Sequence, residues 1–266
     1  MRSIICFLCL LLLLYGCSSL RTSYPAFEQP AQNTIEDPSL PEHILTVLKQ
    51  RNQEIKSFKG IGRIKISDLQ SRRSARFAFA GQERKLRLEI LDIAGQPLIS
   101  LAYDGEWLYL AQHAENRFYQ KKSLAGNLQQ FITIPLTIRE LIALLSGRVP
   151  LIEYASAALE RDPGGQGYRL TLNGSWLQRG REHITLAADM KTVQRYERFD
   201  GRGKLIYAAD IKSEKQADGH WIPQRLSFAD TDQHQLLMDI ETYRPNADMD
   251  ASIFVLKKPD TAIRMD

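Results

Sequence analysis

Histidine is the residue type in this chain best suited to proton transfer or metal binding, and the chain has five. They are His43, His113, His183, His220 and His234, and they are scattered along the sequence. No two have helical ligand spacing, and there is no H-E-x-x-H motif. We therefore expect surface or turn histidines and no metal site.

Motifs of other catalytic sites are also missing from the sequence. There is no G-x-S-x-G nucleophile elbow, no Walker motif and no G-x-G-x-x-G. The glycines of the segment 162–167 follow a proline and precede an expected strand, which is typical of a turn and not of a phosphate-binding loop. We expect no catalytic residue, no cofactor and no enzyme activity.

The N-terminus offers the one clear use of a cysteine. The apolar run 4–15 follows Arg2 and has the length of a signal-peptide core, too short to span a bilayer. It ends in Leu14-Tyr15-Gly16-Cys17, which resembles a bacterial lipobox. That resemblance implies a signal peptide over residues 1–16 and lipidation of Cys17. A plain secretory signal or a short anchor is the alternative.

Cleavage before Cys17 would remove Cys6 and Cys9, so no thiol would remain for a disulfide, a metal or catalysis. Two or more acyl chains hold a protein stably at a membrane, whereas one binds marginally. The next residue is Ser18, which in the enterobacterial sorting rule, carried over by resemblance, favours the outer membrane. We expect a protein anchored by its lipid to the periplasmic face of the outer membrane.

Composition and charge limit the domain count and the partners. The net charge of +4 is small and spread along the chain, whereas a nucleic-acid surface would cluster its basic residues. Residues 17–38 are rich in proline and small polar residues, which predicts a flexible tether. No linker follows Pro41, so residues 39–266 are expected to form one domain.

Two segments have the period of amphipathic helices. In the first, Ser39 and Glu42 have capping-box spacing, and an apolar face contains Ile44, Leu45, Leu48 and Ile55. In the second, Thr137 and Glu140 have the same spacing. Its apolar face is Ile138, Leu141, Ile142 and Leu145, and Gly147 is placed as a C-terminal glycine.

Elsewhere apolar residues alternate with polar ones, which predicts antiparallel strands with one buried face and one face exposed to solvent. We expect a mainly β protein (α+β) with 11–12 strands. They lie near residues 63–66, 76–79, 85–90, 98–103, 107–112, 117–121, 168–173, 184–186, 192–199, 205–211, 221–228 and 236–240. The hairpin around Asp104-Gly105 is apolar on both faces, so it must be covered on both sides or offer one side to a ligand. Pro223 indicates an edge strand or a bulge.

The apolar face of this sheet has two interpretations. If the two helices cover it completely, it is a packed core, and apolar strand faces usually are core. If they cover it loosely, the concave side of a curved sheet becomes an apolar cavity for acyl chains.

The order of these elements resembles the LolA/LolB superfamily of periplasmic lipoprotein carriers and outer-membrane receptors, in its lipid-anchored, LolB-like branch. Three stretches carry the likeness. They are Asp92-Ile93-Ala94-Gly95-Gln96-Pro97-Leu98, Ile134-Pro135-Leu136 before a helix that ends Leu145-Ser146-Gly147-Arg148, and Asp218-Gly219-His220-Trp221-Ile222-Pro223-Gln224-Arg225-Leu226.

The resemblance implies an unclosed β-barrel with helices as a lid over a cavity for acyl chains. It implies a receptor that accepts lipoproteins from a soluble LolA-like carrier and releases them into the outer membrane without a nucleotide. A carrier or sensor of another envelope lipid, or a non-enzymatic structural envelope lipoprotein, are the alternatives.

The site residues expected from this reasoning line a cavity and insert into a membrane. The cavity set is Phe77, Phe79, Leu88, Leu101, Trp107, Tyr109, Leu141 and Leu145. In LolB the loop after the third strand carries a protruding leucine that enters the membrane, and Ala94 stands at that position here. Its neighbour Ile93 could serve instead if it is exposed, or could be a buried strand-end residue.

Overall fold

The computed structural model describes residues 35, 37–122, 128, 132, 134–176, 179–215, 219–258 and 263–265. The chain divides into two compact units, Met1–Asn33 and Thr34–Asp266, and every described residue belongs to the second. The expected signal peptide, Cys17 and nearly all of the expected tether lie outside the described residues. No helix of the described part is long and apolar enough to cross a membrane.

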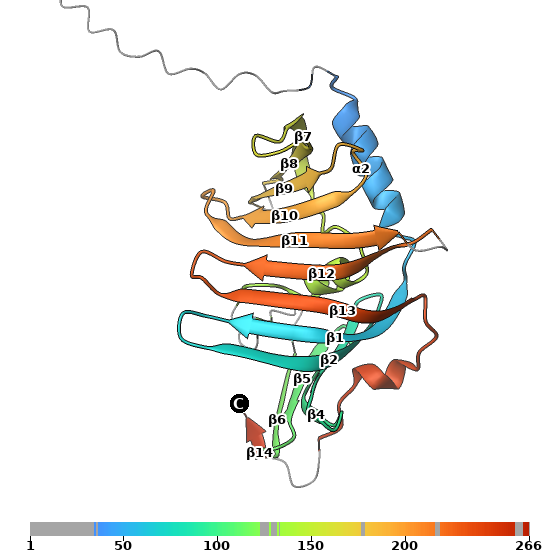
Figure 1. Cartoon of the computed structure of the whole chain (residues 1–266), viewed down its shortest axis with the longest axis vertical. Helices are drawn as coiled ribbons and strands as arrows, with labels where there is room; N and C mark the ends of the chain where they lie inside the picture. The colour runs from blue at the N-terminus through green and yellow to red at the C-terminus, as the bar shows by residue number, and fades with distance from the viewer. Residues whose placement is uncertain are drawn as a thin grey trace, which may run out of the picture. The chain divides into compact units, whose positions relative to one another are not determined.

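One fourteen-stranded sheet forms the framework of the second unit (Figure 1). Its strands run in the order β14-β6-β5-β4-β3-β2-β1-β13-β12-β11-β10-β9-β8-β7. Their bounds are β1 Ser57–Ser67, β2 Arg72–Gln82, β3 Lys85–Leu91, β4 Pro97–Tyr103, β5 Trp107–Gln112, β6 Arg117–Lys122, β7 Tyr154–Arg161, β8 Tyr168–Gly174, β9 Arg181–Leu186, β10 Val193–Phe199, β11 Leu205–Lys215, β12 Trp221–Ala229, β13 Gln235–Pro245 and β14 Ile263–Met265.

Neighbouring strands pair antiparallel throughout, except that β14 pairs with β6 in parallel. No pairing in the described residues joins the two ends of the order, so the sheet is an unclosed barrel. This confirms the predicted architecture. The predicted strand count of 11–12 is too low, because β7 and the three-residue β14 have no apolar pattern that marks a strand.

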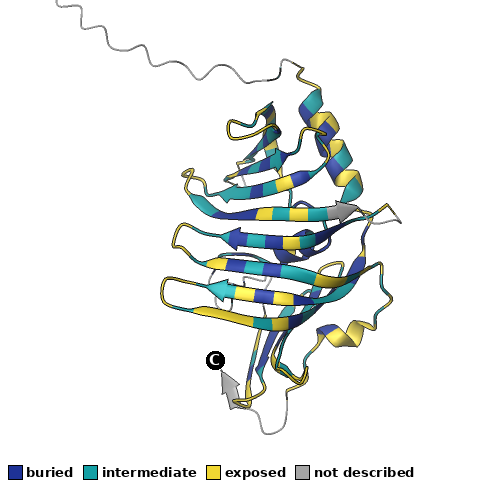
Figure 2. Cartoon of the chain, viewed as in Figure 1, coloured by how far each residue is buried: buried dark blue, intermediate teal, exposed yellow. Residues whose placement is uncertain are grey.

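Burial alternates along the strands, as Figure 2 shows. One face, here called the inner face, contributes residues such as Phe58, Phe77 and Tyr196 to the main core cluster, and the buried isoleucines and leucines of both helices belong to the same cluster. The opposite, outer face is largely polar. Alternation with a period of two therefore places one continuous apolar surface against the helices.

The first helix, α2 (Leu40–Arg51), packs against β7. Ile44, Leu45 and Leu48 are buried as predicted, and Ile55 is also buried but lies beyond the helix end. The predicted capping box at Ser39 is wrong: Ser39 has a helical backbone conformation and makes no cap hydrogen bond. Its amide and hydroxyl instead donate to the Asp37 carboxylate, at 2.9 and 2.6 Å.

The second helix, α4 (Ile138–Leu145), contacts β12 and β3 on the inner face. Its predicted capping box is confirmed: Thr137 accepts from the Glu140 amide, and the Glu140 carboxylate accepts from the Thr137 amide at 2.8 Å. Gly147, with φ of +69°, ends the helix. Its amide donates to Leu144 and the Arg148 amide donates to Ala143, which is a Schellman motif.

The hairpin β4–β5 buries apolar side chains on both faces, which is one of the two expected outcomes, while Leu98 and Ile99 at the start of β4 remain exposed. Leu108 and Leu110 join the main core, and Tyr109 joins a second cluster on the outer face with Phe118 and Leu256. Leu256 belongs to the C-terminal segment, which contains the 3₁₀ helix η1 (Ala251–Phe254). Pro223 faces a register irregularity between Lys212 and Ser213, which confirms a bulge on an interior strand.

We predict that Gly147→Ala destabilises the fold more than Gly203→Ala does. Both glycines have positive φ, and a β-carbon in that conformation costs about 1–2 kcal/mol. At Gly203 the added atom meets nothing within 4 Å, whereas at Gly147 it would lie 2.3 Å from the Trp221 carbonyl oxygen. Chemical denaturation measures both free energies of unfolding, and equal losses would contradict the packing of the α4 end against β12.

Candidate functional site

Six of the eight residues expected to line a cavity lie together on the inner face. Phe77, Phe79, Leu88 and Leu101 come from β2, β3 and β4, and Leu141 and Leu145 come from α4; all six belong to the main core cluster or pack against it. Leu88 is half-buried and the other five are at most 6% exposed. The rings of Phe77 and Phe79 stack with centroids 5.3 Å apart. In this conformation α4 and the sheet fill the space between them.

The other two, Trp107 and Tyr109, lie on the outer face of β5. Tyr109 is buried with Ala102, Ala111 and Phe118, and Trp107 packs against this group. Successive residues of a strand point to opposite faces, so these two cannot share the space of the six. The pattern of β5 is apolar at nearly every position, and periodicity therefore gave no means of separating the faces.

Four polar connections hold α4 and its following segment in place. The Tyr243 hydroxyl donates to the Leu145 carbonyl at 2.9 Å. Asn52 pairs with the backbone of Val149 through its amide nitrogen and its oxygen, at 2.9 and 3.0 Å. The Arg148 guanidinium donates to the Ile55 carbonyl.

The fourth connection is an ion pair between Glu140 of α4 and Arg198 of β10. The Glu140 side chain is only 8% exposed and also accepts from the Thr137 amide. Separating a buried carboxylate from its partner strongly destabilises the folded state, so this pair fixes where α4 lies on the sheet.

A cleft of about 1020 Å³ opens beside α4. It lies between the helix, the segment 148–152 and strands β9 and β10. Its polar lining includes the arginines Arg139, Arg148, Arg179, Arg181 and Arg198. Trp176, which is 82% exposed, stands at its rim. Sequence reasoning missed this cleft because its residues are contributed by segments far apart in the chain.

Glu182 lies on the inner face of β9 and lines the cleft, although the residue is only 1% exposed. Its carboxylate accepts from the Tyr196 hydroxyl at 2.5 Å and from the Ile152 amide at 3.1 Å. Burial raises the pKa of Glu182 to about 7, against the lowering effect of these hydrogen bonds. Burial likewise raises the pKa of Tyr196 well above 10.

One serine and one histidine lie at the distance of a nucleophile and its base. Ser100 Oγ is 2.8 Å from His113 Nε2, and it also contacts the Glu89 carboxylate at 3.4 Å. Ser100 is completely buried, so a substrate cannot reach its hydroxyl. Within the described residues no group of three or more His, Cys, Asp and Glu side chains could hold a metal. The Ser100–His113 pair therefore presents no accessible nucleophile in this conformation.

The loop between β3 and β4 presents an exposed apolar tip. Ile93 is fully exposed and Ala94 is exposed beside it. The loop is an ordered turn, because the Gly95 amide donates to the Asp92 carbonyl at 3.1 Å and the Gln96 amide donates to the Asp92 carboxylate at 2.8 Å. Leu98, at 41% exposure, adds to this apolar surface. The alternative in which Ile93 is a buried strand-end residue is therefore wrong.

The fold is shared with solved proteins of low sequence identity. A DUF1329 family protein from Desulfovibrio piger matches with a TM-score of 0.59 and 14% identity, over 82% of this chain and 98% of its own. A putative outer membrane lipoprotein-sorting protein domain from Vibrio parahaemolyticus matches with 0.59 and 10% identity, over 82% and 97%.

A LolA superfamily protein from Nitrosomonas europaea matches with a TM-score of 0.53 and 12% identity, over 80% of this chain and 97% of its own. No family model and no curated protein sequence matches the chain. At these identities the likeness shows the fold alone, which this chain shares with the three proteins.

We predict that Glu182→Gln changes how stability depends on pH. A carboxyl group whose pKa rises from 4.5 to about 7 on folding makes the folded state less stable as pH rises through that window. Glutamine keeps a polar group there without a charge. Between pH 4 and pH 8 the variant should therefore gain about 3 kcal/mol relative to the wild type, because each pKa unit corresponds to about 1.4 kcal/mol.

Urea denaturation at a series of pH values measures this difference. Glu83→Gln, at an exposed turn, is the matched control and should follow the wild-type profile. A Glu182→Gln profile parallel to that of the wild type would contradict the assigned burial of the charge.

Proposed function

We propose that this protein is a lipid-anchored envelope protein that binds acyl chains between α4 and the inner face of its open sheet. In the full proposal Cys17 carries the lipid and residues 17–38 form the tether. The domain then accepts lipoproteins from a periplasmic LolA-like carrier and inserts them into the outer membrane. The fold of the described part and the exposed apolar loop support this proposal.

The observation that carries the proposal is that one short helix covers the middle of the apolar inner face. An apolar surface spanning most of the sheet is closed in its middle by α4, a helix of only eight residues. The described polar connections of this helix are few, and a cleft adjoins it. Moving α4 would expose Leu141, Leu145, Phe77 and Phe79 to an entering chain, which would replace the contacts that the helix gives up.

Transfer by this route needs no nucleotide. Burying an acyl chain contributes about 0.8 kcal/mol per methylene group, whether the chain lies in a protein or in a bilayer. Exchange between carrier, receptor and membrane can then run on small differences in affinity. The arginine-lined cleft beside α4 suits the polar part of an acylated N-terminus, whose carbonyl groups accept hydrogen bonds.

A second candidate is a structural envelope lipoprotein whose sheet face is only a core. The tight burial of the six inner-face residues favours it. The two functions differ in one property, because a structural protein would not exchange its core contacts for an acyl chain.

We predict that the protein binds a synthetic triacylated lipopeptide and does not bind the same peptide without acyl chains. The full chain carrying Cys17→Ala, purified from the periplasm without detergent, avoids its own lipid. Methyl NMR should show shifts at Leu141 and Leu145 on binding, because these residues lie under α4. No saturable binding of the lipopeptide would favour the structural function.

We also predict that Ile93→Glu abolishes release of bound lipopeptide into vesicles while leaving its binding unchanged. A branched apolar side chain on an exposed loop enters the membrane interface favourably, and a carboxylate does not. Leu69→Glu is the matched control, since Leu69 is 75% exposed in the β1–β2 turn and should release normally. Equal release by Ile93→Glu and the wild type would remove the insertion role of this loop.

A further inference from the structure

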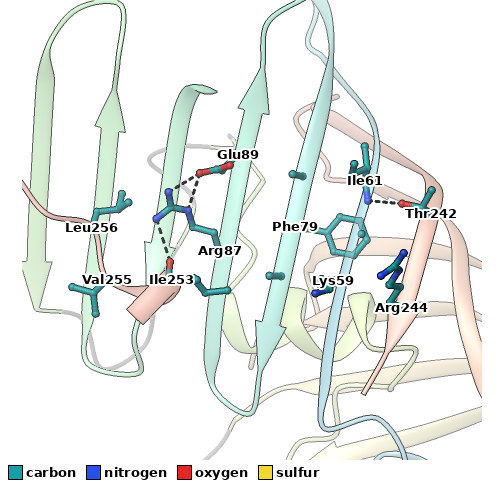
Figure 3. A pocket seen from close by; sticks show the side chains of 13 residues that line it. Lys59, Ile61, Phe79, Arg87, Glu89, Thr242, Arg244, Ile253, Val255 and Leu256 are labelled. Carbon is teal, nitrogen blue, oxygen red and sulfur yellow. Dashed lines mark hydrogen bonds and ion pairs between the residues drawn. The ribbon is translucent and has the colours of Figure 1, made fainter. Parts of the chain in front are cut away.

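The outer face of the sheet carries a groove that the proposed function does not use (Figure 3). It has a volume of about 840 Å³, within the range of small-ligand sites. The C-terminal segment forms one wall over strands β13, β1, β2 and β3. The lining residues are Lys59, Gly60, Ile61, Ala78, Phe79, Ala80, Arg87, Glu89, Thr242, Arg244, Ile253, Val255 and Leu256.

The wall of this groove is a fixed part of the fold. Phe254 is completely buried and holds η1 to the sheet. The Arg87 guanidinium donates to the Ile253 carbonyl at 3.2 Å and pairs with Glu89 at 2.6 Å, as Figure 3 shows. Phe254 and Arg87 therefore present the neighbouring Ile253 and Val255 as an apolar wall, although Val255 remains 43% exposed.

The floor of the groove is made of small residues. Ala78 and Ala80 are adjacent outer-face positions of β2, with the long side chains of Ile61 and Lys59 opposite them on β1. Arg87 and Glu89 are opposite them on β3. The groove therefore runs over these two alanines, between two rows of longer side chains.

At one end of the groove lie two cations with no carboxylate partner among the described residues. Lys59 and Arg244 are directly opposite each other on β1 and β13, and neither makes an ion pair with any described residue. Two like charges opposite each other destabilise a sheet. Further along the same strands, Arg63 and Arg76 share the carboxylate of Glu241, so the unpaired charges belong to the groove end.

We propose that this groove binds an amphiphile with a single acyl chain and an anionic phosphate or carboxylate head group. The chain lies over Ala78 and Ala80 against Ile61 and Val255, and the head group binds Lys59 and Arg244. An anion at this position removes the repulsion between the two cations. The apolar floor and wall explain why a lipid, and not a free anion, is the ligand. The site is separate from the inner face beneath α4.

The test uses the full chain carrying Cys17→Ala and palmitoyl lysophosphatidylglycerol below its critical micelle concentration. Calorimetry should give saturable binding of one molecule, and methyl NMR should show shifts at Ile61 and Ile253 with Leu141 and Leu145 unchanged. Palmitoyl lysophosphatidylcholine keeps the phosphate but adds a choline cation, which is repelled by Lys59 and Arg244, so it should bind at least about tenfold more weakly. Inorganic phosphate alone should bind more weakly still.

Two pairs of variants separate the head-group site from the chain site. Lys59→Gln with Arg244→Gln should weaken lysophosphatidylglycerol binding about tenfold or more and weaken lysophosphatidylcholine binding much less, since its choline cation already offsets the attraction of the phosphate. Lys65→Gln with Arg72→Gln removes two exposed charges of the same sheet outside the groove and should change neither. Ala78→Phe fills the groove and should abolish binding of both lipids. Ser74→Phe, on the same strand outside the groove, is its control.

The proposal would be overturned by no saturable binding, by equal affinity in the Lys59→Gln/Arg244→Gln variant, or by methyl shifts confined to Leu141 and Leu145. Phosphate that binds as tightly as lysophosphatidylglycerol would reduce the site to an anion site and would also overturn it. If Ala78→Phe fails to fold by circular dichroism, the exposed charge variants still decide the result. A negative result for this groove would not affect the lipopeptide experiment, which tests binding at the inner face separately.

Discussion

An open sheet with one apolar face must be covered, and this requirement organises the described part of the molecule. Thirteen antiparallel strands put one apolar surface on the inner face, and α2 and α4 bury much of it. Polar contacts attach α4 to the sheet. They include the ion pair of Glu140 with Arg198 and the hydrogen bond from the Tyr243 hydroxyl to the Leu145 carbonyl. Apolar contacts favour closure without fixing a position, so the directional bonds decide where α4 rests.

The same polar contacts give the inner face its chemical character. Glu182, Tyr196 and Glu140 are buried at the edge of a largely apolar interior, where an unpaired polar group is costly, and Arg198, which pairs with Glu140, is partly exposed. Displacement of α4 would separate Glu140 from Arg198 and leave each open to water or to a polar ligand. The proposed binding of acyl chains requires this helix to give way to another apolar occupant while the sheet stays folded.

Local rules in the sequence predicted much of this fold. Strands such as β3 and β11 alternate cleanly, and α4 has a capping box at its start and a glycine at its end, so both kinds of element were predicted correctly. Ser39 has the same capping-box spacing but failed as a cap, because Asp37 binds its amide and hydroxyl. β7 was missed because Ala155, Ala157 and Ala158 give it no apolar alternation.

The sites were harder to predict because they depend on contacts between distant segments. Glu140 and Arg198 are 58 residues apart, and nothing in either local sequence indicates that they pair. Trp107 and Tyr109 were grouped with the inner-face residues because β5 is apolar on both sides. The outer groove depends on the register of four strands and on the path of the C-terminal segment, neither of which a single sequence reveals.

The most direct test of the central claim is native mass spectrometry of the Cys17→Ala protein, purified gently from the periplasm. The proposed function predicts a stoichiometric complex with a triacylated lipoprotein. Free lipid in its place would indicate a carrier of another envelope lipid. A protein that is empty as purified and stays empty after incubation with acylated peptide would contradict acyl-chain binding and leave the inner face as an ordinary core.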